Sequence, residues 1–282
     1  MDIQWYPGHM TKAKRQMQED IKLVDLVIEL LDARIPASSE NPDIDTLAQN
    51  KARLVILNKA DLADENANRK WKAYFEKRGM AVILADSRNS GSFKTLSGLV
   101  SEACREKIER DRRRGIKNRP VRTMVAGIPN VGKSTFINTY AKKAVAKTGN
   151  KPGVTKGKQW IRLGKDLELL DTPGILWPKF EDEKVGVNLS LTGSISDNIL
   201  NLEELSLKLI AFLRQNYAGV LSSRYDIKEE GADADMLYAI GERRGCVGKG
   251  GEISYEKAAN ILIDEFRSGK LGRISLELPP EE

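Results

Sequence analysis

The segment Gly127-Ile128-Pro129-Asn130-Val131-Gly132-Lys133-Ser134 has the spacing GxxxxGK[ST] and follows an apolar, strand-like segment, Val121–Ala126. Glycines at these positions let the backbone curl so that its N–H groups point at phosphate oxygens. The lysine supplies positive charge to the β- and γ-phosphates, and the serine hydroxyl is a ligand for Mg²⁺. A chance glycine-rich turn is disfavoured, because the strand, the lysine and the serine are all in place. The predicted phosphate-binding residues are Gly127, Asn130, Val131, Gly132, Lys133, Ser134 and Thr135.

A second motif, Asp171-Thr172-Pro173-Gly174, follows the strand-like segment Leu167–Leu170. In P-loop proteins an aspartate at such a strand end holds Mg²⁺, often through water, and the glycine N–H approaches the γ-phosphate. Between the two motifs, Thr155 lies in a run of small and charged residues without periodicity. Its hydroxyl completes the Mg²⁺ shell if the loop orders around a triphosphate, whereas an ordinary flexible loop is the alternative. The predicted metal ligands are Ser134, Thr155 and Asp171, and Gly174 is a predicted phosphate contact.

The motif Asn58-Lys59-Ala60-Asp61 comes directly after the strand-like segment Arg53–Leu57. A carboxylate at Asp61 can accept hydrogen bonds from both the N1–H and the exocyclic amine of guanine. Adenine lacks this paired donor edge, so it would leave a contact of Asp61 unsatisfied. Together with the two preceding motifs, this one predicts a GTP site in which Asn58, Lys59 and Asp61 recognise guanine.

Strand-like and helix-like segments alternate through residues 1–185, as an α/β sheet requires, and helical periodicity dominates residues 186–282. We therefore predict an α/β domain with a mainly parallel sheet over 1–185, followed by a smaller all-helical domain over 186–282. A basic segment, residues 112–120, is the expected linker before Val121. The expected strands are Leu26–Leu31, Arg53–Leu57, Ala81–Leu84, Val121–Ala126, Gln159–Leu163, Leu167–Leu170 and Ile274–Leu278. The expected helices are Thr11–Leu23, Trp71–Arg78, Phe93–Arg110, Leu202–Gln215, Ala234–Arg243 and Tyr255–Arg267.

Composition excludes several other classes of protein. With 282 residues, two cysteines and a single histidine, the chain has neither a disulfide scaffold nor a cysteine- or histidine-rich metal site. The N-terminus carries an early acid and lacks the apolar core of a signal peptide, and the most apolar stretch, Leu23–Leu31, is too short to span a bilayer. We expect a cytoplasmic protein with no membrane partner.

The order of the motifs is unusual, because the guanine motif precedes the phosphate loop. With this order the chain resembles the circularly permuted GTPases of the YlqF type, the ribosome biogenesis GTPase A family. The resemblance covers nearly the whole chain, and the basic linker is where the original termini join. The guanine-contacting loop expected after Ala81–Leu84 matches less well, with Ser87 as its candidate contact. The matching segments are Trp5–Met10, Asp32–Pro36, Asn58–Asp61, Gly127–Ser134, Asp171–Glu183 and Arg244–Cys246.

The resemblance implies slow unaided hydrolysis of GTP. Ile175 stands where many GTPases have a glutamine that orients the attacking water, and it cannot hydrogen-bond to water. His9 is the internal candidate for that role, since neutral imidazole can orient water, although a helix-start contact or a partner contact would equally explain it. Asn130 either shapes the phosphate loop or, as the resemblance implies, helps to hold K⁺ beside the phosphates. The predicted catalytic residues are His9, Lys133 and Gly174.

The charge distribution suggests a polyanionic partner, with a well-solvated surface as the alternative. Residues 1–185 hold 35 Lys and Arg against 24 Asp and Glu, whereas residues 186–282 hold 11 against 16. The resemblance implies the maturing large ribosomal subunit, its rRNA and its proteins as partners of a monomer. A signalling switch whose partner is a protein remains an alternative function. An ATP-using transferase or kinase is disfavoured, because Asp61 matches guanine and not adenine. The cations that would form a basic face on the helical domain, if they are more than a solvated charge pattern, are Arg243, Arg244, Lys249, Arg267, Lys270 and Arg273.

Overall fold

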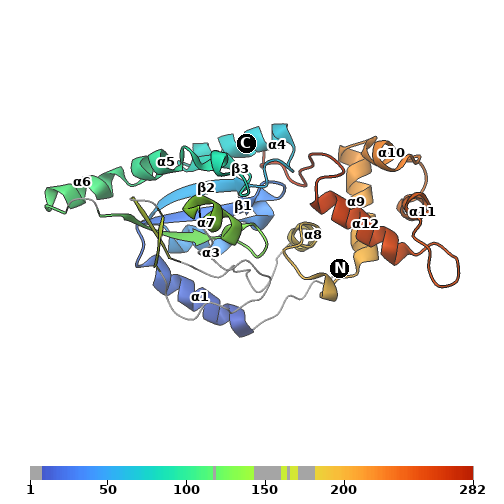
Figure 1. Cartoon of the computed structure of the whole chain (residues 1–282), viewed down its shortest axis with the longest axis horizontal. Coiled ribbons are helices and arrows are strands. Elements are labelled where there is room, and N and C mark those ends of the chain that lie inside the picture. The colour runs from blue at the N-terminus through green and yellow to red at the C-terminus, as the bar shows by residue number, and fades with distance from the viewer. Residues whose placement is uncertain (1–7, 117–118, 143–159, 164–165, 171–181, 282) are drawn as a thin grey trace.

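The computed structural model describes residues 8–116, 119–142, 160–163, 166–170 and 182–281, with side chains from residue 15 onward. A six-stranded sheet lies at the centre of the first part of the chain (Figure 1). Its strand order is β3-β2-β1-β4-β6-β5, and every neighbouring pair is parallel except the antiparallel pair β5 and β6. The strands are β1 (Leu26–Asp32), β2 (Ala52–Asn58), β3 (Ala81–Ala85), β4 (Val121–Ala126), β5 (Trp160–Leu163) and β6 (Leu167–Leu170).

Helices cover both faces of the sheet, which explains the continuous apolar strands. All seven residues of β1 are buried, and alternate residues point to opposite faces. Leu26, Ile28 and Leu30 belong to the core shared with α5 (Leu96–Ala103) and α7 (Lys133–Ala141). On the other face, apolar side chains of the sheet pack against α1, α3 and α4. These helices span Gly8–Ile21, Pro42–Leu47 and Glu65–Lys77.

Two neighbouring strands, β1 and β4, send the chain to opposite faces of the sheet. The chain leaving β1 continues through the four-residue α2 (Pro36–Ser39) to α3, whereas the chain leaving β4 enters α7 on the opposite face. A crevice for ligands forms at the carboxyl ends of strands where connections diverge in this way. The phosphate-loop sequence lies at this point of the sheet.

The second half of the described chain is helical, as expected. Leu205, Leu209 and Leu213 form the buried face of α9, which packs against α11 and α12. Ser254 accepts a hydrogen bond from the Lys257 N–H and caps the start of α12, as its residue type favours. The helices are α8 (Glu183–Leu191), η2 (Asp197–Ile199), α9 (Leu202–Asn216), α10 (Val220–Tyr225), α11 (Asp233–Arg244) and α12 (Tyr255–Arg267).

The single helix predicted over Phe93–Arg110 is wrong. The structure instead has a 3₁₀ turn η1 (Ser90–Phe93), then α5, then a separate helix α6 (Arg105–Arg113). Cys104 ends α5 and begins α6 with non-helical backbone angles, and its side chain is buried in the core. The charged helix α6 begins after this single non-helical residue, continues roughly along the direction of α5 and extends beyond the sheet (Figure 1).

The strand predicted over Ile274–Leu278 is also wrong. Residues 273–277, which we call the C-terminal strap, form no strand, and two of their backbone N–H groups donate to carbonyls in loops. Ile274 N–H donates to the Leu62 carbonyl (3.0 Å) and Leu276 N–H to the Arg34 carbonyl (2.8 Å). The strap thus returns from the helical half to the loops after β1 and β2, and the C-terminal end of the chain lies beside α4 (Figure 1).

The other expected elements are confirmed to within a few residues, except that the helix expected over Trp71–Arg78 begins earlier. Asp64 caps α4, so this helix starts at Glu65. Short helices α2, α3, α8 and α10 were not expected. Within the described residues, no helix has the length and apolar character needed to cross a membrane.

Candidate functional site

The carboxyl ends of four parallel strands bring the predicted motifs together. Asp32 ends β1, Asn58 ends β2, Ala85 ends β3, and the phosphate loop follows Ala126 at the end of β4. The backbone joins two of these ends directly, because Ala60 N–H donates to the Ala85 carbonyl (3.0 Å). Segments far apart in the sequence therefore form one polar site along this edge of the sheet.

The phosphate loop has no space for side chains at its two glycines. A Cβ at Gly127 would lie 2.8 Å from the Leu30 carbonyl oxygen, and one at Gly132 would lie 2.4 Å from the Asn58 amide nitrogen. Gly132 also has a φ of +101°, in the region that favours glycine. It precedes Lys133, the first residue of α7, so the loop places backbone N–H groups at a helix N-terminus that favours anions.

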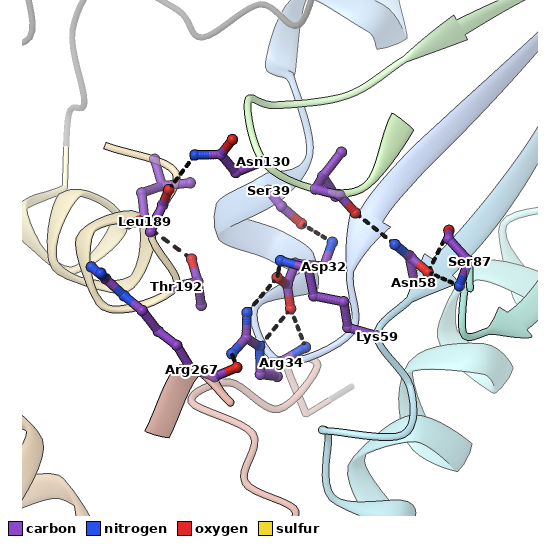
Figure 2. Close-up of polar contacts among 12 residues, drawn as sticks. Asp32, Arg34, Ser39, Asn58, Lys59, Ser87, Asn130, Leu189, Thr192 and Arg267 are labelled. Carbon is purple, nitrogen blue, oxygen red and sulfur yellow. Dashed lines mark hydrogen bonds and ion pairs between the residues drawn. The ribbon is translucent and has the colours of Figure 1, made fainter. Parts of the chain in front are cut away.

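Ser134 and Thr135 follow Lys133 in the first turn of α7, and all three side chains are partly exposed. A hydroxyl at this position, next to a helix N-terminus that favours anions, suits Mg²⁺, which binds oxygen ligands and phosphate together. Asn130 has a φ of +60°, and its amide donates to the Gly193 carbonyl (2.7 Å) in the turn after α8 (Figure 2). This contact fits the loop-shaping interpretation of Asn130.

Asn58 connects the guanine motif to the phosphate loop. Its Nδ2 donates to the Val131 carbonyl (2.6 Å), and its Oδ1 accepts from the backbone N–H (2.9 Å) and hydroxyl (2.7 Å) of Ser87 (Figure 2). Both Asn58 and Ser87 are almost fully buried. Ser87 therefore anchors Asn58, and its hydroxyl is already engaged by the protein rather than turned towards a ligand.

Lys59 is held by a buried carboxylate that the motif does not include. Its Nζ lies 2.9 Å from Asp32 Oδ2, and Arg34 binds both oxygens of the same carboxylate, through Nε (2.9 Å) and Nη2 (2.8 Å) (Figure 2). Burial would raise the pKa of Asp32, but the charges of Arg34 and Lys59 outweigh it and hold that pKa well below its usual range. Burial also lowers the pKa of Lys59, against the attraction of Asp32.

The same cluster reaches the helical half of the protein. Arg34 Nη1 donates to the Arg267 carbonyl (3.4 Å), and the guanidinium lies 5.5 Å from the centre of the Phe266 ring at the end of α12. The guanidinium of Arg267 in turn donates to the carbonyls of Ser190 (2.7 Å) and Leu191 (3.0 Å). The guanine motif, the end of β1 and the helices of the second half are thus linked through polar contacts.

Asp61, the residue expected to recognise the base, lies at the surface and contacts Arg88. The Arg88 Nη2 atom is 2.7 Å from Asp61 Oδ2. No site role was predicted for Arg88, Asp32 or Arg34, although Asp32–Pro36 is one of the segments that carry the family resemblance. The position of Asp32 at the end of an apolar strand, like Asn58 at the end of the next one, was the signal that could have found it.

Several predicted site residues lie outside the described residues. These are Thr155, Asp171 and Gly174, together with Ile175. His9 belongs to α1, but its side chain is also outside the described part. The structure therefore brings together the phosphate loop, the guanine motif and Ser87, and their assigned roles in binding remain predictions.

Comparisons with known proteins agree with this arrangement. Residues 122–235 match the family model described as 50S ribosome-binding GTPase. The ribosome biogenesis GTPase A of Bacillus licheniformis is 48% identical over 282 residues, covering 100% of both chains. The protein of the same name from Thermotoga maritima is 33% identical over 279 residues, covering 99% of this chain and 95% of the relative.

Among solved structures, a GDP-bound TM YlqF has a TM-score of 0.70 at 26% identity and covers 95% of this chain and 100% of its own. A GNP-bound YlqF from T. maritima has a TM-score of 0.66 at 27% identity, covering 96% and 100%. The mainly parallel sheet, the phosphate loop after β4 and the guanine motif after β2 define a P-loop GTPase with a permuted order of motifs. The identity over the full length shows further that the chain belongs to the ribosome biogenesis GTPase A family.

Replacing Gly132 by alanine is expected to weaken GDP binding about tenfold or more. The new Cβ would displace the Asn58 amide from the Val131 carbonyl and would strain a left-handed backbone. Gly115→Ala is the matched control, because Gly115 has a φ of +77° and a Cβ there meets no atom within 4 Å. Titration with a fluorescent GDP analogue checks the prediction, and equal affinities of the two variants would contradict it.

Proposed function

We propose that the protein is a GTP-hydrolysing assembly factor that acts in the cytoplasm on the maturing large (50S) ribosomal subunit. In this proposal, residues 1–185 form the GTPase domain, residues 186–282 form a helical domain that contacts RNA, and the protein is a monomer. GTP binding and hydrolysis control docking to the subunit and release from it. Family membership and the basic excess of residues 1–185 support the proposal.

The nucleotide part of the proposal is carried by one observation. Asn58 joins the guanine motif to the phosphate loop through the Val131 carbonyl, so a base and its phosphates would be bound by segments that position each other. Lys133 and the loop N–H groups would hold the phosphates, with Gly174 contributing a further N–H. Bound Mg²⁺ would neutralise phosphate charge and would be held by Ser134, Thr155 and Asp171.

Hydrolysis is proposed to be slow until the subunit completes the site. Ile175 offers no hydrogen bond to the attacking water, so the orienting group is either His9 or a group supplied by the subunit. K⁺ beside Asn130 would add positive charge near the phosphates. In the structure the Asn130 amide is bonded to Gly193, and this bond would have to open for the side chain to face an ion.

A surface suited to rRNA phosphates lies on α6. Arg110, Arg112, Arg113 and Arg114 are exposed at the end of this helix, which projects on the side of the sheet away from the helical half (Figure 1). Arginines grouped on an exposed helix favour a phosphate backbone. Most cations expected to form a basic face in the second half instead make contacts within the protein: Arg243 with Asp226, Arg244 with Glu265, Arg267 with Asp197, and Arg273 with the Ala60 and Ala63 carbonyls.

The test is single-turnover GTP hydrolysis with and without purified large subunits, at two salt concentrations. Strong stimulation that falls with salt is expected, because binding to phosphates releases counterions. In a variant with Arg110, Arg112 and Arg114 replaced by glutamine, subunit binding is expected to depend less on salt. The slope of the logarithm of the binding constant against the logarithm of salt concentration should decrease by roughly 0.7–0.9 for each phosphate that the variant no longer neutralises. The matched control replaces three exposed or half-exposed cations of α4, Arg69, Lys70 and Lys72, by glutamine.

Two outcomes would contradict this proposal. No stimulation by subunits, with GTP binding intact, would favour a GTP switch whose partner is a protein. Equal losses of stimulation in the α6 variant and the α4 control would show that total charge, and not the end of α6, determines the interaction.

A further inference from the structure

Arg88 joins two acidic side chains at the ends of neighbouring strands. Its Nε and Nη2 lie 2.8 and 3.0 Å from the two oxygens of Asp86, and the same Nη2 lies 2.7 Å from Asp61 Oδ2. The backbone N–H of Arg88 also donates to Asp86 Oδ1 (2.9 Å). The guanidinium is therefore fixed by Asp86 on its own turn, and from there it reaches across to the carboxylate that follows β2.

The turn that carries Arg88 is itself anchored. Ser87, the preceding residue, is buried and donates twice to Asn58, and the Ala85 carbonyl accepts from Ala60 N–H. Arg88 is thus held at a fixed distance from the guanine motif, although its side chain is 70% exposed. The Asp86 side chain is only 27% exposed, and the hydrogen bond from Arg88 lowers its pKa, so the anchoring carboxylate stays charged.

Recognition of guanine requires both carboxylate oxygens of Asp61 as hydrogen-bond acceptors. The N1–H and the 2-amino group of the base are parallel donors, so the carboxylate plane must lie in line with the base edge. A one-third exposed aspartate can rotate about its Cβ–Cγ bond, and this freedom disappears when the base binds. Arg88 contacts only Oδ2, and each carboxylate oxygen has more than one acceptor position, so the contact leaves capacity for the base.

We propose that Arg88 is a positioning residue that orients the Asp61 carboxylate for the two donors of guanine and so sharpens selection for the 2-amino group. The inference rests on the proposed guanine site and extends it to a residue outside the guanine motif. Asp86 fixes Arg88, Arg88 fixes Asp61, and Asp61 accepts from the base.

The experiment compares the affinities of GDP and inosine diphosphate, which lacks the 2-amino group, for the full-length wild type and for Arg88→Ala. Because the residue is exposed, its removal is expected to leave the melting temperature unchanged. GDP affinity is expected to fall about two- to fivefold, within the range found for exposed charged contacts, while inosine diphosphate affinity falls less. The ratio of the two affinities therefore decreases in the variant.

Two further variants identify the cause. Asp86→Ala is expected to reproduce part of the loss in GDP affinity, because Arg88 then has no anchor, whereas Arg69→Ala removes another exposed arginine and is expected to change nothing. A rise in GDP affinity in Arg88→Ala would overturn the inference and show that Arg88 obstructs the base. An unchanged ratio would also overturn it. If the wild type itself fails to prefer GDP to ADP, the proposed guanine site fails, which is a different result.

Discussion

Replacing Asp61 by asparagine is expected to change the preferred base from guanine to xanthine. The asparagine amide offers one acceptor and one donor, so its NH₂ group would face the 2-amino group of guanine, donor against donor. Xanthine carries a carbonyl oxygen at that position and keeps the N1–H, so it matches the new side chain. A donor-against-donor mismatch of this kind costs about 1–3 kcal/mol, or about 5–150-fold in affinity, because the donors are left unsatisfied.

The measurement is a set of binding curves for GDP and xanthosine diphosphate with wild type and Asp61→Asn. A gain in xanthosine diphosphate binding cannot arise from misfolding, so it isolates recognition of the base. Glu76→Gln is the matched control, because it removes one exposed carboxylate near the C-terminal end of α4, at the opposite end of that helix from the guanine motif. Loss of GDP binding without any gain for the xanthine nucleotide would assign base recognition to another residue.

Replacing Asp32 by alanine is expected to lower the free energy of unfolding by about 3–5 kcal/mol, because it leaves buried charge uncompensated. The carboxylate is fully buried and binds both Arg34 and Lys59. Without it, two cations remain close together where the end of β1 meets the helical half. Urea unfolding of wild type and variant measures the difference. The double variant Asp32→Ala, Arg34→Met is expected to lose less stability than the single one, because it removes a buried cation with the anion.

The contribution of Asp32 is also expected to depend on pH with a definite sign. Because the pKa of Asp32 is lower in the folded protein than in the unfolded chain, its stabilisation is fully present above the unfolded value of about 3.9. Stabilisation is lost as pH falls towards the folded pKa. The difference between wild type and Asp32→Ala should therefore stay constant from about pH 6 to 8 and shrink below about pH 4. A difference that grows on acidification would show that Asp32 is not the charged partner of the two cations.

The hydrophobic pattern of the sequence predicts the strands and most long helices. The positions of the motifs at the carboxyl ends of those strands then predict where the site lies. Buried apolar runs such as Leu54–Leu57 predict strands because both faces of the sheet are covered. Motifs placed after β2 and β4 had to meet, since parallel strands present their carboxyl ends at one edge. The single helix predicted over Phe93–Arg110 failed because the helical period persists across Cys104 although the backbone angles of that residue interrupt the helix.

The parts that could not be predicted depend on contacts between distant segments. Asp32 and Arg34 lie two residues apart, yet their role depends on Lys59 and on the end of α12. Ser87, the predicted guanine contact, pairs with Asn58, and it is the next residue, Arg88, that contacts Asp61. The spacing of the motifs does not predict this contact. The apolar alternation of Ile274–Leu278 predicted a strand, but these residues fill the space between loops.

The C-terminal strap has a consequence for how the protein is made. Glu277 contacts Ser38 across 239 residues of sequence, and Arg273 binds the Ala60 and Ala63 carbonyls. At a synthesis rate of about 5–20 residues per second, Arg273 is synthesised roughly 10–40 s after the loop that it contacts. During that interval Arg273 does not yet bind the Ala60 and Ala63 carbonyls, and Glu277 does not yet contact Ser38 after β1. Full bracing of the nucleotide site therefore follows translation of the helical half, so a chain interrupted before residue 273 lacks these contacts altogether.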